Sequence, residues 1–139
     1  MIIEWKEKYR VGIDIIDEQH KKLFETAGKI YDLLNNDIYT DKYDRIVELI
    51  YELKDYALYH FKTEEEYMQK IGYRKFLSHK VYHDDFVEKI NSIDLESIDQ
   101  DHDAYLLEML EFVVNWIDEH ILKNDKQITS EVAESSKQA

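Results

Sequence analysis

The sequence predicts an all-α protein, specifically an up-down-up-down four-helix bundle with an extended N-terminal arm. The chain has 139 residues with no proline and only three glycines, the two residue types that most disfavour helix interiors. Four segments carry apolar residues at the spacing of an amphipathic helix. Short connections between these segments place successive helices antiparallel. We therefore expect one domain over residues 1–127 and a polar, disordered tail over residues 128–139.

Residues 1–16 form the expected arm. Their apolar and polar side chains alternate around Trp5 and Val11, which indicates an extended segment lying on the body of the protein. The chain has no second strand-like run to pair with it, so we do not assign it to a sheet. From Asp17, which we interpret as the N-cap, the pattern changes to helical spacing and continues to Leu34.

Three more helices follow along the chain. The second covers residues 41–71 and ends at Gly72, a typical C-terminal stop. The third covers residues 76–93. The fourth begins after the acidic stretch 99–103, and its pattern fades at residues 123–125. These helices complete the predicted bundle, and no linker divides the chain.

The charge and the lack of cysteine exclude several classes of function. The chain has 18 Lys and Arg against 31 Asp and Glu, a formal net charge of −13, which disfavours nucleic acid and anionic membranes as partners because both require clustered cations. Without cysteine there are no disulfides, thiolate metal sites or cysteine nucleophiles. No apolar run approaches the roughly 18 residues of a transmembrane helix, and the first residues lack a signal-peptide layout. We expect a cytoplasmic protein with no membrane partner.

Five of the six histidines fall on the apolar stripes of the predicted helices. A buried imidazole without a partner costs on the order of 1–3 kcal/mol, so these histidines need partners. Two carboxylates complete the set, one four residues after a histidine and the other five residues after one. The candidate metal ligands are His20, His60, Glu64, His79, His83, His120 and Asp125.

The topology predicts that these side chains meet. Two pairs in the set are four residues apart, so each pair projects from one face of its helix. His120 and Asp125 are five apart, which is about 140° on an ideal helix, and helix termination or long side-chain reach must take up this offset. In an antiparallel bundle, the start of the first helix lies beside the end of the second, the start of the third and the end of the fourth. All seven candidates occupy these places, so we expect them to converge on one layer.

Each observation alone has an ordinary structural explanation. A lone buried histidine is more often a hydrogen-bonded core residue than a ligand, and histidine–glutamate pairs four apart occur on ordinary helices. Seven such residues at matched depth on four helices favour a metal site instead. His102 differs, because it lies in the acidic helix start at the other end of the bundle, and we interpret it as a surface residue.

The number and type of ligands indicate two metal ions. Seven ligands are too many for one octahedral ion, and nitrogen and oxygen ligands without sulfur suit iron or manganese better than a structural zinc site. Two octahedral ions bridged by Glu64, Asp125 and one oxide or hydroxide account for the whole set. This arrangement fills every coordination position except one, and the open position lies on only one of the two ions.

The order of these residues resembles the hemerythrin family, specifically its stand-alone bacterial type, the bacteriohemerythrins. The resemblance covers roughly residues 3–126, essentially the whole domain. It consists of an opening motif and three ligand motifs. These are Trp5…Tyr9…Val11-Gly12-Ile13…Ile16-Asp17-Glu18-Gln19-His20-Lys21-Lys22-Leu23-Phe24, then His60-x3-Glu64, His79-x3-His83 and His120-x4-Asp125.

The resemblance implies two iron ions, Fe2+ or Fe3+, with a bridging oxide or hydroxide. One iron would be held by His79, His83 and His120, and the other by His20 and His60. The two carboxylates would bridge the ions, and the second iron would hold the open position. Apolar residues next to the ligands in sequence, or one helical turn away, are candidates to line an O2 pocket there. They are Phe24, Phe61, Trp116, Ile117 and Ile121.

The ligand composition predicts O2 binding rather than O–O cleavage. Ferritin-like di-iron oxygenases and oxidases use Glu-x-x-His motifs and four carboxylates. This chain has no Glu-x-x-His motif, and fewer anionic ligands stabilise high-valent iron less well. The resemblance likewise implies reversible O2 binding for oxygen carriage, storage or delivery, in a protein that is not an enzyme.

Two other functions are compatible with these residues. A di-iron oxidase, a peroxidase or an enzyme acting on nitric oxide would consume its substrate over multiple turnovers. A sensor of oxygen or iron would act through a protein partner in trans, because the segment after Asp125 is too short for an output domain.

Overall fold

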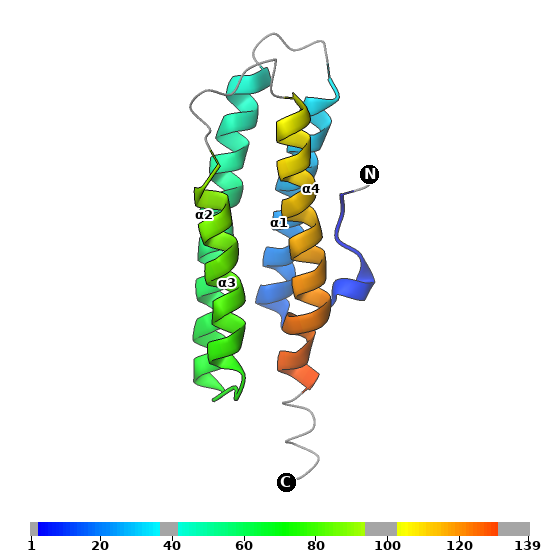
Figure 1. The fold of residues 1–139 in the computed structure, drawn as a ribbon. Helices are drawn as coiled ribbons and strands as arrows, with labels where there is room; N and C mark the ends of the chain where they lie inside the picture. The colour runs from blue at the N-terminus through cyan, green and yellow to red at the C-terminus, as the bar shows by residue number, and fades with distance from the viewer. Residues whose placement is uncertain (1–2, 37–41, 94–102, 131–139) are drawn as a thin grey trace.

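The computed structural model describes residues 3–36, 42–93 and 103–130, which form a bundle of four antiparallel helices (Figure 1). This part of the chain contains no strand. The predicted all-α bundle is therefore confirmed. The elements in chain order are η1 (Glu7–Tyr9), α1 (Asp14–Leu34), α2 (Lys42–Lys70), α3 (Phe76–Asn91), α4 (Asp103–His120) and η3 (Ile121–Asp125).

The helices pack against their neighbours around the bundle, most extensively α1 against α2. Figure 1 shows α2 beside α3 and α1 beside α4, and α1 also packs against α2. Their apolar stripes face inward, and Ile30, Ile46 and Leu110 are fully buried between them. None of the helices within the described ranges is both long enough and apolar enough to cross a membrane.

The start of α1 differs from the sequence prediction. The helix begins at Asp14, and Asp17 lies inside its first turn rather than at the N-cap. The carboxylate of Asp17 instead accepts hydrogen bonds from the backbone N–H groups of Val11 (2.8 Å) and Gly12 (3.1 Å). Gly12 has a φ of +97°, a region that favours glycine, so the chain can turn sharply there before the helix. Asp17 therefore fastens the preceding loop to the helix.

The N-terminal arm lies on the bundle, as predicted, and is extended except for the single 3-10 turn η1. Tyr9 and Val11 are buried, and the Tyr9 hydroxyl donates a hydrogen bond to Asp118 of α4. The Ile3 carbonyl oxygen lies 3.2 Å from the place that a Cβ at Gly28 would occupy. A glycine at this position of α1 therefore lets the arm approach the helix closely.

The ends of α2 and α3 agree with the predicted boundaries to within a few residues. α2 stops before Gly72, whose φ of +67° lies in the left-handed region, and the N–H of Tyr73 donates to the Met68 carbonyl at 2.8 Å. α3 begins at Phe76 and ends two residues before the expected end.

The C-terminal boundary needs correction. After η3 the chain returns to α-helix over residues 126–130, and Ile128 is fully buried against Met68 and Tyr73. Residues 128–130 therefore belong to the bundle and not to a disordered tail. Ile128 is an isolated apolar residue in a polar segment, so periodicity gave no signal for it. The rest of the predicted tail, and the predicted surface position of His102, lie outside the described residues.

Candidate metal centre

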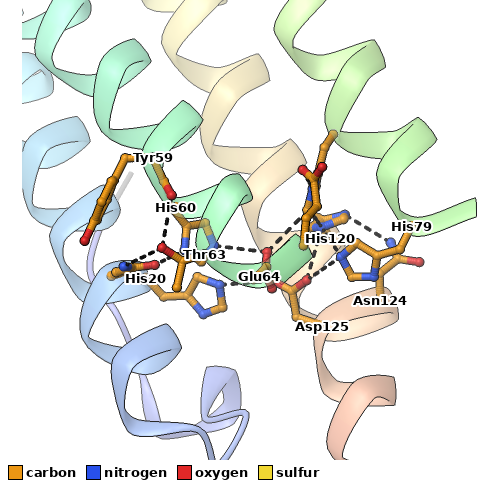
Figure 2. Close-up of polar contacts among 12 residues, drawn as sticks. His20, Tyr59, His60, Thr63, Glu64, His79, His120, Asn124 and Asp125 are labelled. Atoms are coloured by element: carbon orange, nitrogen blue, oxygen red, sulfur yellow. Dashed lines mark hydrogen bonds and ion pairs between the residues drawn. The ribbon is translucent and has the colours of Figure 1, made fainter. Parts of the chain in front are cut away.

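The seven predicted ligands lie together inside one end of the bundle (Figure 2). α1 contributes one of them, α2 two, α3 two, α4 one and η3 one. Every one of these side chains is buried. They are His20, His60, Glu64, His79, His83, His120 and Asp125, with exposed fractions between 0% and 4%.

Local helix geometry explains how each element delivers its ligands. The spacing of four residues between His60 and Glu64 keeps both on one face of α2. The spacing of five between His120 and Asp125 does not suit an α-helix, and the chain changes to the π-helical turn η3 over Ile121–Asp125. A π-helix has hydrogen bonds between residues five apart and more residues per turn than an α-helix, so this turn reduces the expected 140° offset and brings Asp125 Oδ1 to 3.1 Å from Nε2 of His120. The regular α-helix ends at His120, and the π-helical turn that follows takes up the offset.

The ligands form two clusters that share both carboxylates. One cluster contains three histidines with Glu64 and Asp125, and the other contains two histidines with the same carboxylates; within each, the ligand atoms lie within 4.8 Å of one another. In the three-histidine cluster, the Nε2 of His120 lies 2.9 Å from Nε2 of His83 and 3.1 Å from Nε2 of His79. Three imidazole nitrogens therefore point at one place.

Each carboxylate contacts histidines of both clusters. Asp125 places Oδ1 3.0 Å from Nε2 of His79 and Oδ2 3.0 Å from Nε2 of His20. Glu64 places Oε2 3.2 Å from Nε2 of His60 and 3.4 Å from Nε2 of His83. The two oxygens of Asp125 are thus directed to different clusters, which is the arrangement of a bridging carboxylate.

The buried atoms of this site fit metal ions. Both oxygens of Glu64 and of Asp125 are buried without a hydrogen-bond partner, although imidazole nitrogens lie close to them. Three converging imidazoles cannot satisfy one another, because each neutral ring has only one N–H. Neighbouring ligands on one ion with bonds of about 2.1 Å lie about 3.0 Å apart, close to the observed nitrogen separations. The site therefore has the donor atoms and the spacing of a metal centre.

The groups of the centre shift one another's pKa values. Burial acts to raise the pKa of Asp125 and of Glu64, but the facing imidazoles outweigh it and lower both. Burial lowers the pKa of His60, and Glu64 offsets this only in part. At His83 burial opposes the charged form, yet the nearby carboxylates of Glu64 and Glu65 raise the pKa to about 9. The two carboxylates stay ionised and attract cations.

Comparison with known proteins identifies the family. The family model described as "Hemerythrin HHE cation binding domain" matches residues 11–131, most of the chain. The chain belongs to the hemerythrin family. A bacteriohemerythrin from Clostridium acetobutylicum is 52% identical over 123 residues, covering 88% of this chain and 95% of the relative. The resemblance recognised from the sequence is therefore confirmed.

Further relatives of this hemerythrin domain agree in sequence and in fold. A bacteriohemerythrin from Methylococcus capsulatus is 32% identical over 126 residues, covering 86% of this chain and 87% of its own. A crystal structure of wild-type hemerythrin superposes with a TM-score of 0.75 at 28% identity, covering 91% of this chain and 95% of the other. Membership of this family implies a non-heme metal centre, and the seven-residue cluster is suited to hold it.

Three residues outside the predicted set contact the outer nitrogens of the histidines in this hemerythrin domain. Gln19 Oε1 lies 2.7 Å from Nδ1 of His60, and Glu65 Oε2 lies 3.0 Å from Nδ1 of His83. The amide nitrogen Nδ2 of Asn124 lies 3.3 Å from the Nδ1 of His120. Such partners orient a metal-binding imidazole. The sequence did not predict these contacts, although each of the three residues is adjacent to a predicted ligand in sequence.

A small, mostly apolar cavity lies beside the centre. The centre of a water-sized molecule can occupy about 10 Å³ of this cavity. The cavity therefore has room for about one small molecule. Of the predicted pocket residues, Phe61, Trp116, Ile117 and Ile121 line it. Further apolar residues line it that were not predicted. They are Leu23, Ala57 and Phe86.

Phe24 does not line the cavity, contrary to prediction. Its ring is buried against Tyr9 of the arm, with ring centroids 4.9 Å apart. Leu23, one position earlier on α1, faces the cavity instead. Successive residues of an α-helix point about 100° apart, so adjacency to a ligand in sequence does not decide which neighbour reaches the cavity.

Proposed function

We propose that this hemerythrin domain binds O2 reversibly at a pair of iron ions, for carriage, storage or delivery of oxygen. One observation carries the proposal. Two buried clusters share both carboxylates, and the small cavity is lined by both histidines of the two-histidine cluster but by only one histidine of the other. The cavity thus lies on the side of the ion that has fewer protein ligands.

The three-histidine cluster would hold one iron through His79, His83 and His120, and His20 and His60 would hold the other. Both carboxylates would bridge them. When bound, a pair of ferrous ions would supply the two electrons that O2 takes up on binding and returns on release. The cation-binding family, the five imidazoles and the absence of sulfur ligands support iron as the metal.

The residues around the cavity determine what reaches the open position. Phe61, Trp116, Ile117 and Ile121 present apolar surfaces and offer no charged group to an incoming molecule. Anions and water would lose hydration on entry, whereas O2 carries no charge and forms few hydrogen bonds. The cavity therefore favours O2 over molecules that promote irreversible oxidation.

We propose binding rather than turnover because the centre has only two carboxylates. Five neutral imidazoles and two carboxylates supply less negative charge than the four carboxylates of ferritin-like oxidases. High-valent iron is correspondingly less stable in this centre. The protein would thus release O2 intact, and we do not expect an enzyme. A cytoplasmic location stays a prediction from the sequence.

The test uses anaerobically reduced, iron-loaded protein. Exposure to air should turn it from colourless to coloured through a charge-transfer band, and vacuum should remove the band over repeated cycles. Glu64→Gln should abolish the band, because Glu64 contacts histidines of both clusters. Glu66→Gln is the matched control, because Glu66 is exposed two positions along the same helix. Formation of only oxidised protein and free peroxide would contradict reversible binding, as would sustained O2 consumption with a reductant.

A further inference from the structure

Glu65 brings a carboxylate to the outer edge of a histidine in the metal centre. Its Oε2 lies 3.0 Å from Nδ1 of His83, a residue that is only 1% exposed. The corresponding contact of His60 is to the amide oxygen of Gln19, and that of His120 is to the amide nitrogen of Asn124. Among these three outer contacts, that of His83 alone involves a charged acceptor.

Consecutive residues of α2 reach opposite edges of the same ring. Glu64 places Oε2 3.4 Å from Nε2 of His83, on the inner edge that faces the cluster. Glu65 points about 100° away around the helix and reaches Nδ1 on the outer edge. The imidazole thus spans the distance between a buried carboxylate and a second carboxylate that is 19% exposed.

Aromatic packing fixes the plane in which these contacts are made. The ring of Phe61 stacks on that of His83 with centroids 4.0 Å apart and an interplanar angle of 13°. A stacked ring cannot tilt away from its two carboxylates without losing this contact. Whether Nε2 offers a lone pair in that plane therefore depends on which nitrogen carries the proton and on what that proton contacts.

We propose that Glu65 is a positioning residue for His83. This inference rests on the proposed metal centre. Glu65 accepts a hydrogen bond from the Nδ1–H group, which leaves the lone pair of Nε2 directed at the metal held with His79 and His120. A carboxylate polarises the imidazole more strongly than an amide does. Among the histidines that have an outer partner, His83 should therefore donate electron density to the metal most strongly. Glu65 thereby strengthens the hold of the three-histidine cluster on its ion.

Lys80 connects this contact to the surface. Glu65 and Lys80 both line an open groove between α2 and α3, and Lys80 Nζ lies 3.8 Å from Glu65 Oε1. Lys80 also pairs with Asp84 at 3.0 Å, so its positive charge is shared between two carboxylates and compensates that of Glu65 only in part. The outer carboxylate can therefore keep its charge while solvent reaches it through the groove.

The decisive test compares metal retention in three variants. Glu65→Ala removes both the hydrogen bond and the charge, whereas Glu65→Gln keeps an acceptor and removes only the charge. Glu66→Ala is the control, because Glu66 lines the same groove and is exposed. In anaerobic competition with a chelator for Fe(II), we expect Glu65→Ala to bind iron 10–100-fold more weakly than wild type, with Glu65→Gln intermediate and Glu66→Ala unchanged. Equal affinities of wild type and Glu65→Ala would overturn the proposal.

A spectroscopic measurement separates positioning from general destabilisation. In the Zn2+-loaded, diamagnetic protein, the Nδ1 proton of His83 should resonate far downfield and exchange slowly with solvent. Glu65→Ala should shift this resonance upfield and speed its exchange, without changing the Nδ1 proton of His60, which contacts Gln19. An unchanged His83 resonance would overturn the role of Glu65. If wild type holds metal but fails to bind O2 reversibly, the proposed function fails while both tests of Glu65 still decide this inference.

Discussion

Asp125 directs its two carboxylate oxygens to histidines of different clusters. Oδ1 lies 3.0 Å from His79 and 3.1 Å from His120, and Oδ2 lies 3.0 Å from His20. The residue is fully buried, so a charge at this position needs compensation from cations. Protonated imidazoles or metal ions can provide it, and metal ions satisfy all the oxygens at once. Asp125 therefore couples the two clusters, as Glu64 also does through its contacts with His60 and His83.

At the residue scale, His79→Ala tests the ligand set. The change removes one of three imidazoles from its cluster and leaves Asp125 Oδ1 with one fewer partner. We expect the iron content per chain to fall by about half or more and the melting temperature to fall with it. Metal analysis and thermal unfolding measure the two effects. Asp85→Ala, an exposed position on the same helix, should change neither; unchanged iron content in His79→Ala would contradict the assignment.

Sequence spacing predicted which residues are the candidate ligands, but it predicted only some of the residues that surround them. His60 and Glu64 could be placed together because helical spacing fixes their shared face. Glu65 and Gln19 could not be predicted as partners of histidines, because those contacts depend on how neighbouring helices are rotated and on side-chain rotamers. The same rotation decides that Leu23, and not its neighbour in sequence, lines the cavity.

At the scale of the elements, the π-helical turn η3 and the helical residues after it close the end of the bundle beneath the centre. Lys126 donates a hydrogen bond to the carbonyl of Lys8 at 3.0 Å, and the Thr129 hydroxyl donates to the carbonyl of Val11 at 2.8 Å. The arm and the C-terminal helix therefore hold each other in place. The sequence showed only that the pattern fades there, because a π turn is an adjustment of backbone hydrogen bonds that leaves no periodic signal.

The buried position of Ile128 gives a prediction for this closing segment. Ile128→Ala should lower the free energy of unfolding by about 2–4 kcal/mol, because it leaves a cavity against Met68 and Tyr73. Urea denaturation of the metal-free protein measures the change, and the exposed Ser130→Ala is its control. A difference below about 0.5 kcal/mol would show that residues 126–130 do not pack on the bundle.

The arm gives a prediction for alkaline pH. Burial, together with the hydrogen bond to Asp118, raises the pKa of Tyr9 above its ordinary value of 10.0. The unfolded chain therefore loses this proton at a lower pH than the folded protein does. The stability that Tyr9 contributes is fully present below pH 10 and is lost as the pH rises beyond it. Above pH 10 the melting temperature of wild type should fall more steeply with pH than that of Tyr9→Phe. Parallel curves of melting temperature against pH would contradict the role of this contact.

At the scale of the whole molecule, the bundle places a polar layer inside an otherwise apolar core. Five imidazoles and two carboxylates meet in one layer, while the rest of the interior is filled by side chains such as Ile46 and Leu110. Metal ions bound here would join the facing imidazoles and carboxylates of this layer through coordination bonds. The fold and the centre therefore stabilise each other.

Metal removal should accordingly loosen the whole protein. Exhaustive chelation should lower the free energy of unfolding by about 4 kcal/mol for each ion removed, if the metal had been present at a thousandfold excess over its dissociation constant. Calorimetry before and after chelation measures this change, and restored Fe(II) should reverse it. Identical melting curves with and without metal would show that the layer is stable on its own.

The most direct test of the two-metal centre is anomalous X-ray scattering at the iron edge from crystals of the iron-loaded protein. The account predicts two iron peaks inside the bundle, one against His79, His83 and His120 and one against His20 and His60, with Glu64 and Asp125 between them. A single peak, or iron bound away from these residues, would contradict it.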